Sequence, residues 1–301
     1  MATKRMASNG ASAAPTNGAV VVTGASSGIG RATALRLDRL GFQVFAGVRK
    51  DADGKALKSK AKGMLTPLRL DVTDDASIAA AAEAVGKALG EERGLAGLVN
   101  NAGIAMPGPL EFLPLEDLRA QMDVNVIGQI AVTQAFLPLL RKGFGRIVNI
   151  GSIGGRMATP FQGAYNASKF AMEALTDSLR MELKPWGIHV SIVEPGSIDT
   201  PIWEKGLGQA DVLLAKMPPH ARELYDPAVD AAKAAAEKSA QAGIPPSAVA
   251  KAVVHALTAD KPKTRYVVGN DARIQAVVAR LMPDAMKDWL VAREMGLSQS
   301  R

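Results

Sequence analysis

The stretch that decides the fold is residues 18–30, which read GAVVVTGASSGIG. Its first half is a short run of small and β-branched residues, typical of a buried strand. Its second half places glycines at 24, 28 and 30 before a segment of helical period, and glycines permit a tight turn and close approach to a ligand. The helix offers free N–H groups and its positive dipole end there, so this order predicts a cradle for a dinucleotide pyrophosphate. A glycine cluster taken alone would equally fit a flexible loop.

The same alternation continues along the chain and predicts a parallel sheet. The expected strands are residues 19–23, 43–48, 64–70, 95–100, 145–151, 189–194 and 265–268. The expected helices are residues 28–40, 75–90, 115–141 with a break inside, 163–184, 247–257 and one from residue 271 onward. The predicted fold class is therefore α/β, a doubly wound sheet of about seven parallel strands with helices on both faces.

We expect one dinucleotide-binding catalytic domain over residues 18–301, because the sequence has no internal repeat and no second self-sufficient core. Residues 1–17 are rich in Ala, Ser, Asn and Gly, and we expect a disordered tail there. Residues 197–245 carry scattered prolines and weaker helical periods, which predicts an insertion that serves as a substrate lid. Ligands of open α/β sheets bind beyond the carboxyl ends of the strands, so functional residues should follow the strands.

Composition excludes several kinds of site. The 301 residues include no cysteine, which rules out disulfides, thiolate metal sites and a catalytic thiol, and which fits the cytoplasm. Three dispersed histidines suggest no metal set. The formal net charge of +7 could reflect an anionic partner, but the basic residues are scattered and aromatics make up 4%, so we expect no nucleic-acid partner. Neither a signal peptide nor a transmembrane helix is predicted.

Further motifs follow the glycine turn in a fixed order. They are Asn100-Asn101-Ala102-Gly103, Asn125, Gly151-Ser152, Tyr165-x-x-x-Lys169 and Pro195-Gly196. Together with the spacing Thr-Gly-x-x-x-Gly-x-Gly, they resemble the short-chain dehydrogenase/reductase family over residues 19–260. The strand at 44–49 and the run at 165–171 look like its branch acting on steroids and retinoids. The resemblance implies a Rossmann fold, a nicotinamide cofactor and a homodimer or homotetramer.

The choice between the two nicotinamide cofactors depends on the end of the second strand, which faces the adenosine ribose in this fold. No acid stands at 47 or 48, and Arg49 is placed to pair with the 2′-phosphate of NADP(H), with Lys50 as a possible second cation. NAD(H) is the less expected cofactor, and Arg49 could also be the polar start of a loop. The expected cofactor-binding residues are Gly24, Ser26, Ser27, Gly28, Ile29, Gly30, Arg49, Asp71, Val72, Asn101, Ala102, Gly103, Tyr165, Lys169, Pro195, Gly196, Ile198 and Thr200.

The chemistry predicted for the site is hydride exchange between nicotinamide and a secondary alcohol or ketone. The oxygen needs an acid/base of suitable pKa, and Tyr165 is the candidate. Lys169 lies one helical turn later on the same face, where its charge would lower the pKa of the phenol. Ser152 would donate to the substrate oxygen, and Asn125 resembles the family residue that tethers a water beside the lysine. Singly, each fits a helix face, a cap or a turn; their joint order favours the catalytic set.

The substrate is a small molecule, and the apolar residues of the lid point to a lipophilic one. These residues are Ile202, Trp203, Leu207, Val212, Leu213, Leu214 and Met217, which could equally pack the lid onto the body. A nonenzymatic NADP-binding redox sensor is the alternative function, and an epimerase or dehydratase is a third. Residues 281–290 form an amphipathic segment that we expect to dock on the core or a subunit interface rather than on lipid.

Overall fold

The computed structural model describes residues 18–294 and residue 297, and the tail predicted for residues 1–17 lies outside them. Within this part of the chain one sheet of seven strands has the order β3-β2-β1-β4-β5-β6-β7, and every neighbouring pair is parallel. The strands are β1 Ala19–Val22, β2 Gln43–Val48, β3 Leu65–Arg69, β4 Leu95–Asn100, β5 Arg146–Ile150, β6 His189–Pro195 and β7 Arg265–Val268. The predicted doubly wound fold is confirmed, with strand ends within one residue of the prediction.

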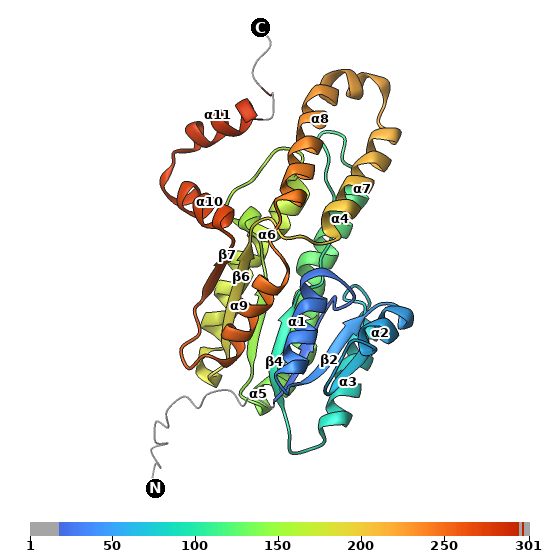
Figure 1. Cartoon of the computed structure of the whole chain (residues 1–301), viewed down its shortest axis with the longest axis vertical. Helices are drawn as coiled ribbons and strands as arrows, with labels where there is room; N and C mark the ends of the chain where they lie inside the picture. Colours follow the sequence, from blue (N-terminus) through green and yellow to red (C-terminus); the bar gives the residue numbers. More distant parts are fainter. Residues whose placement is uncertain (1–17, 295–296, 298–301) are drawn as a thin grey trace.

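Helices connect these strands and cover both faces of the sheet (Figure 1). The α-helices are α1 Gly28–Arg39, α2 Asp51–Lys58, α3 Asp75–Leu89, α4 Leu115–Met122, α5 Gly128–Lys142, α6 Gly163–Glu182, α7 Ile202–Lys216, α8 Pro219–Gln241, α9 Ser247–Thr258, α10 Asn270–Leu281 and α11 Asp284–Glu294. Three short turns, the π-helical η1 Asp123–Ile127 and the 3₁₀ turns η2 Ile153–Gly155 and η3 Lys184–Trp186, complete the set. The break expected inside residues 115–141 is the turn η1.

The core consists of two apolar layers, one on each face of the sheet. Val20 and Val22 of β1 pack with α1 and α9, whereas Val21 between them packs with α3 and α5. This alternation follows from the strand period of two, and burial on both faces explains why β1 is apolar at every position.

Helix α2 was not predicted. It has only eight residues, includes Gly54, and is too short for a helical period to stand out. The glycine lets the helix approach the sheet, because a Cβ at Gly54 would lie 2.9 Å from the Cβ of Pro67 in β3. The helix therefore depends on tertiary packing that its own sequence does not display.

The continuous helical stretch 115–142 departs from the expectation that nothing resembles a membrane span. Its most apolar window of 18 residues has a mean hydropathy of 1.3. By length and composition alone, this helix could cross a membrane. In the fold, the α5 residues Val132, Phe136 and Leu140 face the sheet and are completely buried. Here the stretch serves as a core helix.

The insertion forms two helices, α7 and α8, that project beyond the carboxyl ends of the strands (Figure 1). Its two ends meet in a parallel bridge between Ile198 and Ile244, where Asp199 N donates to Ile244 O at 3.0 Å and Ile244 N donates to Ser197 O at 3.0 Å. The segment thus leaves and rejoins the body at one place, at the boundaries predicted for the lid.

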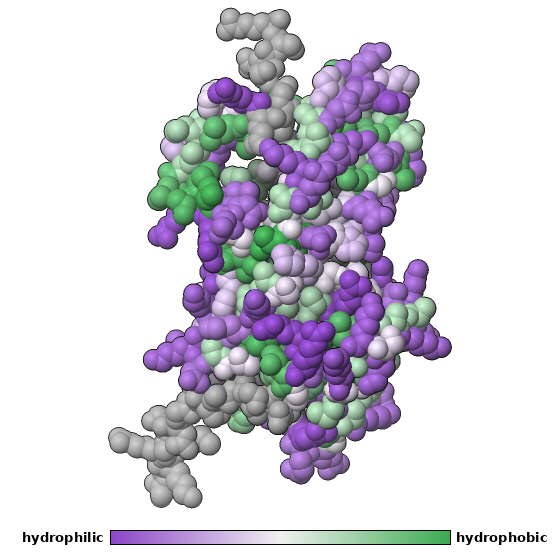
Figure 2. Space-filling view, viewed as in Figure 1, coloured by the Kyte–Doolittle hydropathy of each residue, from purple (hydrophilic) through white to green (hydrophobic). Residues whose placement is uncertain are grey.

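The C-terminal helices α10 and α11 extend away from the body (Figure 1). Apolar side chains gather on them in Figure 2, and the exposed ones include Val277, Leu281, Met286 and Trp289. Of the two alternatives expected for residues 281–290, docking on the core is wrong, and docking at a subunit interface stays a prediction. A short amphipathic pattern shows that one face is apolar but does not show what covers it.

Candidate active site

The glycine turn between β1 and α1 has the geometry of a cradle. Gly24 and Gly28 have positive φ angles of 62° and 51°, which side chains with a Cβ rarely adopt. A Cβ on Gly30 would collide with the carbonyl group of Gly24 and the side-chain amide of Asn101. Ser27 is the N-cap of α1 in an extended conformation and makes no side-chain cap hydrogen bond. The N–H groups that open α1 therefore receive no hydrogen bond from the Ser27 side chain, and such groups at a helix N-terminus suit a pyrophosphate.

Two neighbouring strands are tied together beside this turn. The Thr23 hydroxyl accepts hydrogen bonds from Asn101 N at 2.8 Å and Ala102 N at 2.9 Å. The Asn101 amide donates in return to Thr23 O at 2.9 Å and Gly24 O at 3.2 Å. Asn101 and Ala102 therefore lie at the cradle as predicted, and a Cβ on Gly103 would lie 3.4 Å from the Asn125 side chain.

The loop after β6 closes over the same turn. A Cβ on Gly28 would lie 3.1 Å from the Thr200 methyl carbon, so these two motifs, far apart in sequence, are in contact. Ile198 is buried and its carbonyl accepts from the Trp203 indole at 2.9 Å. Pro195 ends β6, and at Gly196 a Cβ would collide with the carboxylate of Asp271. All four cofactor residues predicted on this loop thus lie on one short segment beside the cradle.

Tyr165 and Lys169 lie one turn apart on α6, as predicted. The Lys169 Nζ lies 5.6 Å from the centre of the Tyr165 ring and donates a 2.8 Å hydrogen bond to Ile150 O at the end of β5. Burial lowers the pKa of Lys169 to about 8, while the nearby Glu173 carboxylate acts in the opposite direction. Its charge is therefore present at neutral pH and is lost in a mildly alkaline range.

The expectation that the pKa of Tyr165 lies below its usual range is not met in this structure. Burial raises the pKa of Tyr165, and the nearby Ser152 hydroxyl acts to lower it. The free-energy cost of removing a phenolate from water therefore exceeds the stabilisation that this hydroxyl provides.

Ser152 follows β5 and lies next to Tyr165. This position is compatible with both uses predicted for its hydroxyl, as a donor to the substrate oxygen and as a cap. Its hydroxyl accepts from Gly154 N at 3.0 Å and so caps the turn η2. The same hydroxyl acts on Tyr165, where it lowers the pKa of the phenol. A serine hydroxyl has one donor and two acceptor positions, so capping leaves its proton available.

Asn125 sits in the π-helical turn η1 and is buried. Its side chain accepts from Ile104 N at 2.8 Å and donates to Ile104 O at 3.0 Å and to Ser168 Oγ at 3.1 Å. The amide therefore links the loop after β4 to α6, the helix that carries Tyr165 and Lys169. Such π-helical turns occur often at functional sites.

The residues expected at the adenosine end occupy the carboxyl ends of β2 and β3. Arg49 and Lys50 follow β2 directly and are exposed, with Lys50 as the N-cap of α2. Asp71 accepts hydrogen bonds from the backbone and the hydroxyl of Thr73 at 3.1 and 2.8 Å, so its carboxylate forms a turn there. Val72 is buried. The remaining members, Ser26 and Ile29, lie in the glycine turn and at the start of α1.

Sequence reasoning missed three groups beside the site. Thr23 follows β1 directly and accepts hydrogen bonds from two backbone N–H groups. Its place in the glycine motif could have suggested this role. Ser168 anchors Asn125 but resembles any small helix residue. Glu194 is completely buried in β6, and a carboxylate inside an apolar strand was a signal that was available. Among the described residues, no group of three or more histidine or acidic side chains is placed to hold a metal ion.

Comparisons with known proteins bear on this geometry. The family model described as short chain dehydrogenase matches residues 18–209. A 3-amino-tetrahydro-pyrrolizinone reductase from Xenorhabdus hominickii is 41% identical over 86% of this chain and 89% of its own length. Retinol dehydrogenase 5 from Mus musculus is 39% identical over 91% and 89%. An NADPH-dependent 3-dehydrocapnine reductase from Ornithobacterium rhinotracheale is 36% identical over 91% and 96%.

Solved structures share the fold over nearly the whole chain. A short-chain dehydrogenase from Streptomyces avermitilis has a TM-score of 0.74 at 30% identity, covering 95% of this chain and 98% of its own. One from Burkholderia cenocepacia in complex with NADP has a TM-score of 0.69 at 28% identity, covering 91% and 97%. One from Burkholderia phymatum in complex with NAD has a TM-score of 0.74 at 25% identity, covering 91% and 95%. The chain belongs to the short-chain dehydrogenase family and is an oxidoreductase acting on CH–OH groups.

Proposed function

We propose that this protein is an NADP(H)-dependent oxidoreductase that interconverts a lipophilic secondary alcohol and its ketone, using Tyr165 as acid/base. The observation that carries the proposal is the gathering of Tyr165, Lys169 and Ser152 at the carboxyl end of β5, the same edge of the sheet at which the glycine turn follows β1. The cradle fits a dinucleotide because Gly30 leaves no space for a Cβ and the N-terminus of α1 is free of a side-chain cap. A bound nicotinamide would supply or accept the hydride.

The protein's own residues would manage the proton. In ketone reduction Tyr165 Oη gives its proton to the carbonyl oxygen while Ser152 Oγ donates a hydrogen bond to the same oxygen. The phenolate left on Tyr165 is stabilised by the ammonium charge of Lys169, which donates to Ile150 O and is held on the same helix face. Asn125 keeps the loop after β4 against α6 while this occurs.

The preference for NADP(H) rests on Arg49. Its guanidinium follows β2, is exposed, and is suited to a bidentate contact with a phosphate. The similarity to an NADPH-dependent reductase supports this choice, whereas solved relatives bind NADP in one case and NAD in another.

A lipophilic substrate is proposed from the lid segment 197–245. Leu213 and Met217 pack with Leu113 and Ala164 and thereby fasten the lid to the body, which was the alternative use of these side chains. Ile202, Trp203 and Leu207 are only partly buried and remain as candidates for substrate contact. Taken with the body, the lid would complete one catalytic domain over residues 18–301, active in the cytoplasm as a homodimer or homotetramer.

The proposal is tested by titrating the purified protein with NADPH and NADH and by following nicotinamide absorbance with a panel of lipophilic ketones. Replacing Arg49 by alanine removes a charge-assisted contact of about 1.5–3 kcal/mol, so NADPH affinity should fall about 10- to 100-fold while NADH affinity stays the same. The matched control is K60A, an exposed cation beyond the end of α2 that should change neither affinity. Tyr165→Phe should bind NADPH normally and turn over no ketone.

Each result separates the hypotheses. Turnover by wild type but not by Tyr165→Phe supports the oxidoreductase, and equal NADPH affinity in wild type and Arg49→Ala removes the assignment of Arg49. Tight NADPH binding without turnover of any ketone or alcohol favours the redox sensor instead. Binding of neither nucleotide would overturn the assignment of the cradle.

A further inference from the structure

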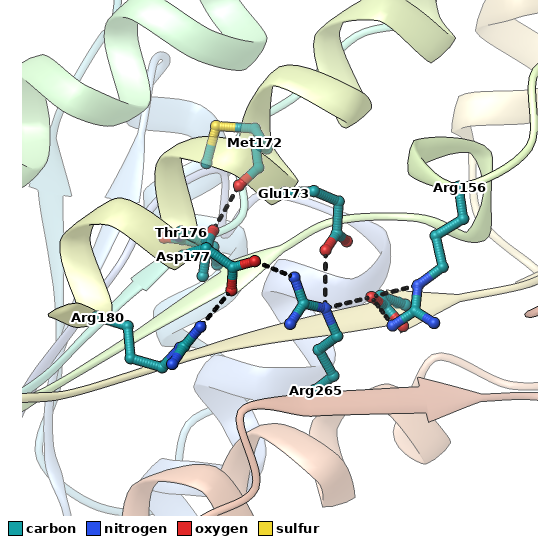
Figure 3. A network of polar contacts seen from close by, with 9 residues as sticks. Arg156, Met172, Glu173, Thr176, Asp177, Arg180 and Arg265 are labelled. Atoms are coloured by element: carbon teal, nitrogen blue, oxygen red, sulfur yellow. Dashed lines mark hydrogen bonds and ion pairs between the residues drawn. The ribbon is translucent and has the colours of Figure 1, made fainter. Parts of the chain in front are cut away.

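A cluster of buried and half-buried charges forms a polar network (Figure 3), and its member Glu173 acts on the charge of Lys169. We call it the acid–arginine cluster, and its members are Arg156, Glu173, Asp177, Arg180, Glu194 and Arg265. Glu173 lies one turn after Lys169 on α6, Glu194 lies on β6, and Arg265 lies on β7. The cluster therefore joins the catalytic helix to the two last strands of the sheet.

Arg265 holds two glutamates with one nitrogen. Its Nε donates to Glu173 Oε2 at 3.1 Å and lies 3.5 Å from Glu194 Oε1, while its Nη2 donates to Asp177 Oδ2 at 2.7 Å. Arg156 binds the same Glu194 Oε1 through Nε at 2.9 Å and Nη2 at 2.7 Å. Figure 3 shows the Arg265 guanidinium joined to both Glu173 and Asp177.

The other oxygen of each glutamate has no donor. Glu173 Oε1 and Glu194 Oε2 are buried and meet no hydrogen-bond partner among the described residues. Leaving two buried carboxylate oxygens unpaired is costly, and two adjacent carboxylates also repel each other. A single proton between the two carboxyl groups would provide the missing donor and remove one of the charges.

We propose that Glu173 and Glu194 share one proton, and that this carboxyl pair is a positioning device that sets the charge experienced by Lys169. Neither glutamate touches the reacting atoms; the pair acts through the lysine. Since the role of Lys169 is to stabilise the Tyr165 phenolate, the second half of the proposal rests on the proposed function.

The electrostatics agree with this geometry. Burial and the neighbouring Glu194 raise the pKa of Glu173 to about 8, and Arg265 acts against them. Burial lowers the pKa of Lys169 to about 8, and the Glu173 charge opposes this. When the pair loses its proton on going to alkaline pH, the new negative charge favours the ammonium form of Lys169 at the pH where it would otherwise be lost.

The remaining charges near the pair are already engaged. Asp177 on α6 is held by Arg180 at 2.7 Å as well as by Arg265, and the pKa of its carboxyl is lowered. Asp271 on α10 accepts from Ser197 N at 2.7 Å, on the loop after β6. The positive charges that act on the shared proton are therefore those of Lys169, Arg156 and Arg265.

The first test measures the proton directly. Infrared difference spectra of the full chain, with ¹³C-carboxyl glutamate, are recorded between about pH 6 and about pH 10, which spans the range around the pKa of Glu173. Wild type should show a protonated glutamate carboxyl band that disappears as pH rises. The band should be missing in both Glu173→Gln and Glu194→Gln and retained in Glu182→Gln, a control at the exposed end of α6.

The second test measures the effect on Lys169. Without the Glu173 charge, Lys169 loses its proton at lower pH, so the alkaline limb of the pH profile of ketone reduction should move to lower pH by about one unit in Glu173→Gln. Glu182→Gln should leave the limb in place. A destabilised but otherwise unaffected enzyme would change its maximal rate without moving the limb.

The outcomes distinguish the two proposals. If wild type shows no titrating band, or if the band persists in either glutamine variant, the shared proton is refuted. A band that behaves as expected with an unmoved alkaline limb refutes the positioning role. If wild type reduces no ketone at all, the proposed function fails while the infrared result still decides the shared proton; should Glu194→Gln not fold, wild type and Glu173→Gln suffice.

Discussion

Replacing Gly30 by alanine tests whether the cradle leaves no space for a side chain. The new Cβ would lie 2.9 Å from the Gly24 carbonyl carbon and would displace the Asn101 amide from its bonds to Thr23 O and Gly24 O. Two hydrogen bonds contribute about 2 kcal/mol and overpacking costs about 1–3 kcal/mol, while alanine in a helix returns about 1 kcal/mol. The free energy of unfolding should therefore fall by about 2–4 kcal/mol.

The assay is thermal unfolding followed by circular dichroism, with NADPH affinity measured on the same samples. A loss of that size should lower Tm by about 5–15 °C, and nucleotide binding should weaken because the cradle itself moves. The control is Gly86→Ala in the last turn of α3, where a Cβ meets nothing within 4 Å and alanine should raise stability by up to about 1 kcal/mol. If Gly30→Ala is as stable as wild type and binds NADPH equally well, the close packing inferred for this turn is wrong.

Three further predictions concern stability. Thr23→Val leaves two backbone N–H groups without their acceptor and should lower the free energy of unfolding in denaturant by about 2–4 kcal/mol. The control is Thr33→Val, which should change it very little because the buried Thr33 hydroxyl has no partner among the described residues. Equal losses in the two variants would contradict this prediction. Because the pKa of Glu173 is raised to about 8 in the folded state, the stability that its protonated form provides is complete below the unfolded value near 4.5 and is lost as pH rises through about 8. Urea unfolding across that range should show a smaller decline in Glu173→Gln than in wild type, and parallel declines would count against the raised pKa. Leu213→Ala removes a buried contact between lid and body that contributes about 2–4 kcal/mol. Limited proteolysis within residues 199–243 should therefore accelerate, while the free energy of unfolding of the core stays the same. The control Val212→Ala, at an exposed position, should be cut at the wild-type rate, and equal rates for both variants would place Leu213 outside the contact.

The sequence predicted the strands and the site motifs because both are local patterns. A buried parallel strand is a nearly continuous apolar run, and the glycine turn, Tyr165 and Lys169 are recognised by spacing alone. The position of the motifs just after the strands follows from the rule that places ligands at the carboxyl edge of the sheet.

The sequence could not predict features that depend on contacts between residues far apart in the chain. Helix α2 exists because Gly54 meets Pro67, and Leu213 faces the body instead of a substrate because Leu113 and Ala164 lie opposite it. The direction of the Tyr165 pKa shift was also wrong, since burial of the ring is a tertiary property that a spacing of four residues does not contain.

The bridge between Ile198 and Ile244 has a consequence for how this protein can change over time. A loop whose two ends are already joined by backbone hydrogen bonds costs little to extend, because the closure entropy grows only with the logarithm of its length, about 0.6 kcal/mol for each doubling. Evolution or an engineer can therefore exchange the helices above the bridge for a longer, shorter or unrelated segment. The nucleotide half of the fold would keep its strands, and selectivity could diversify independently of the hydride chemistry.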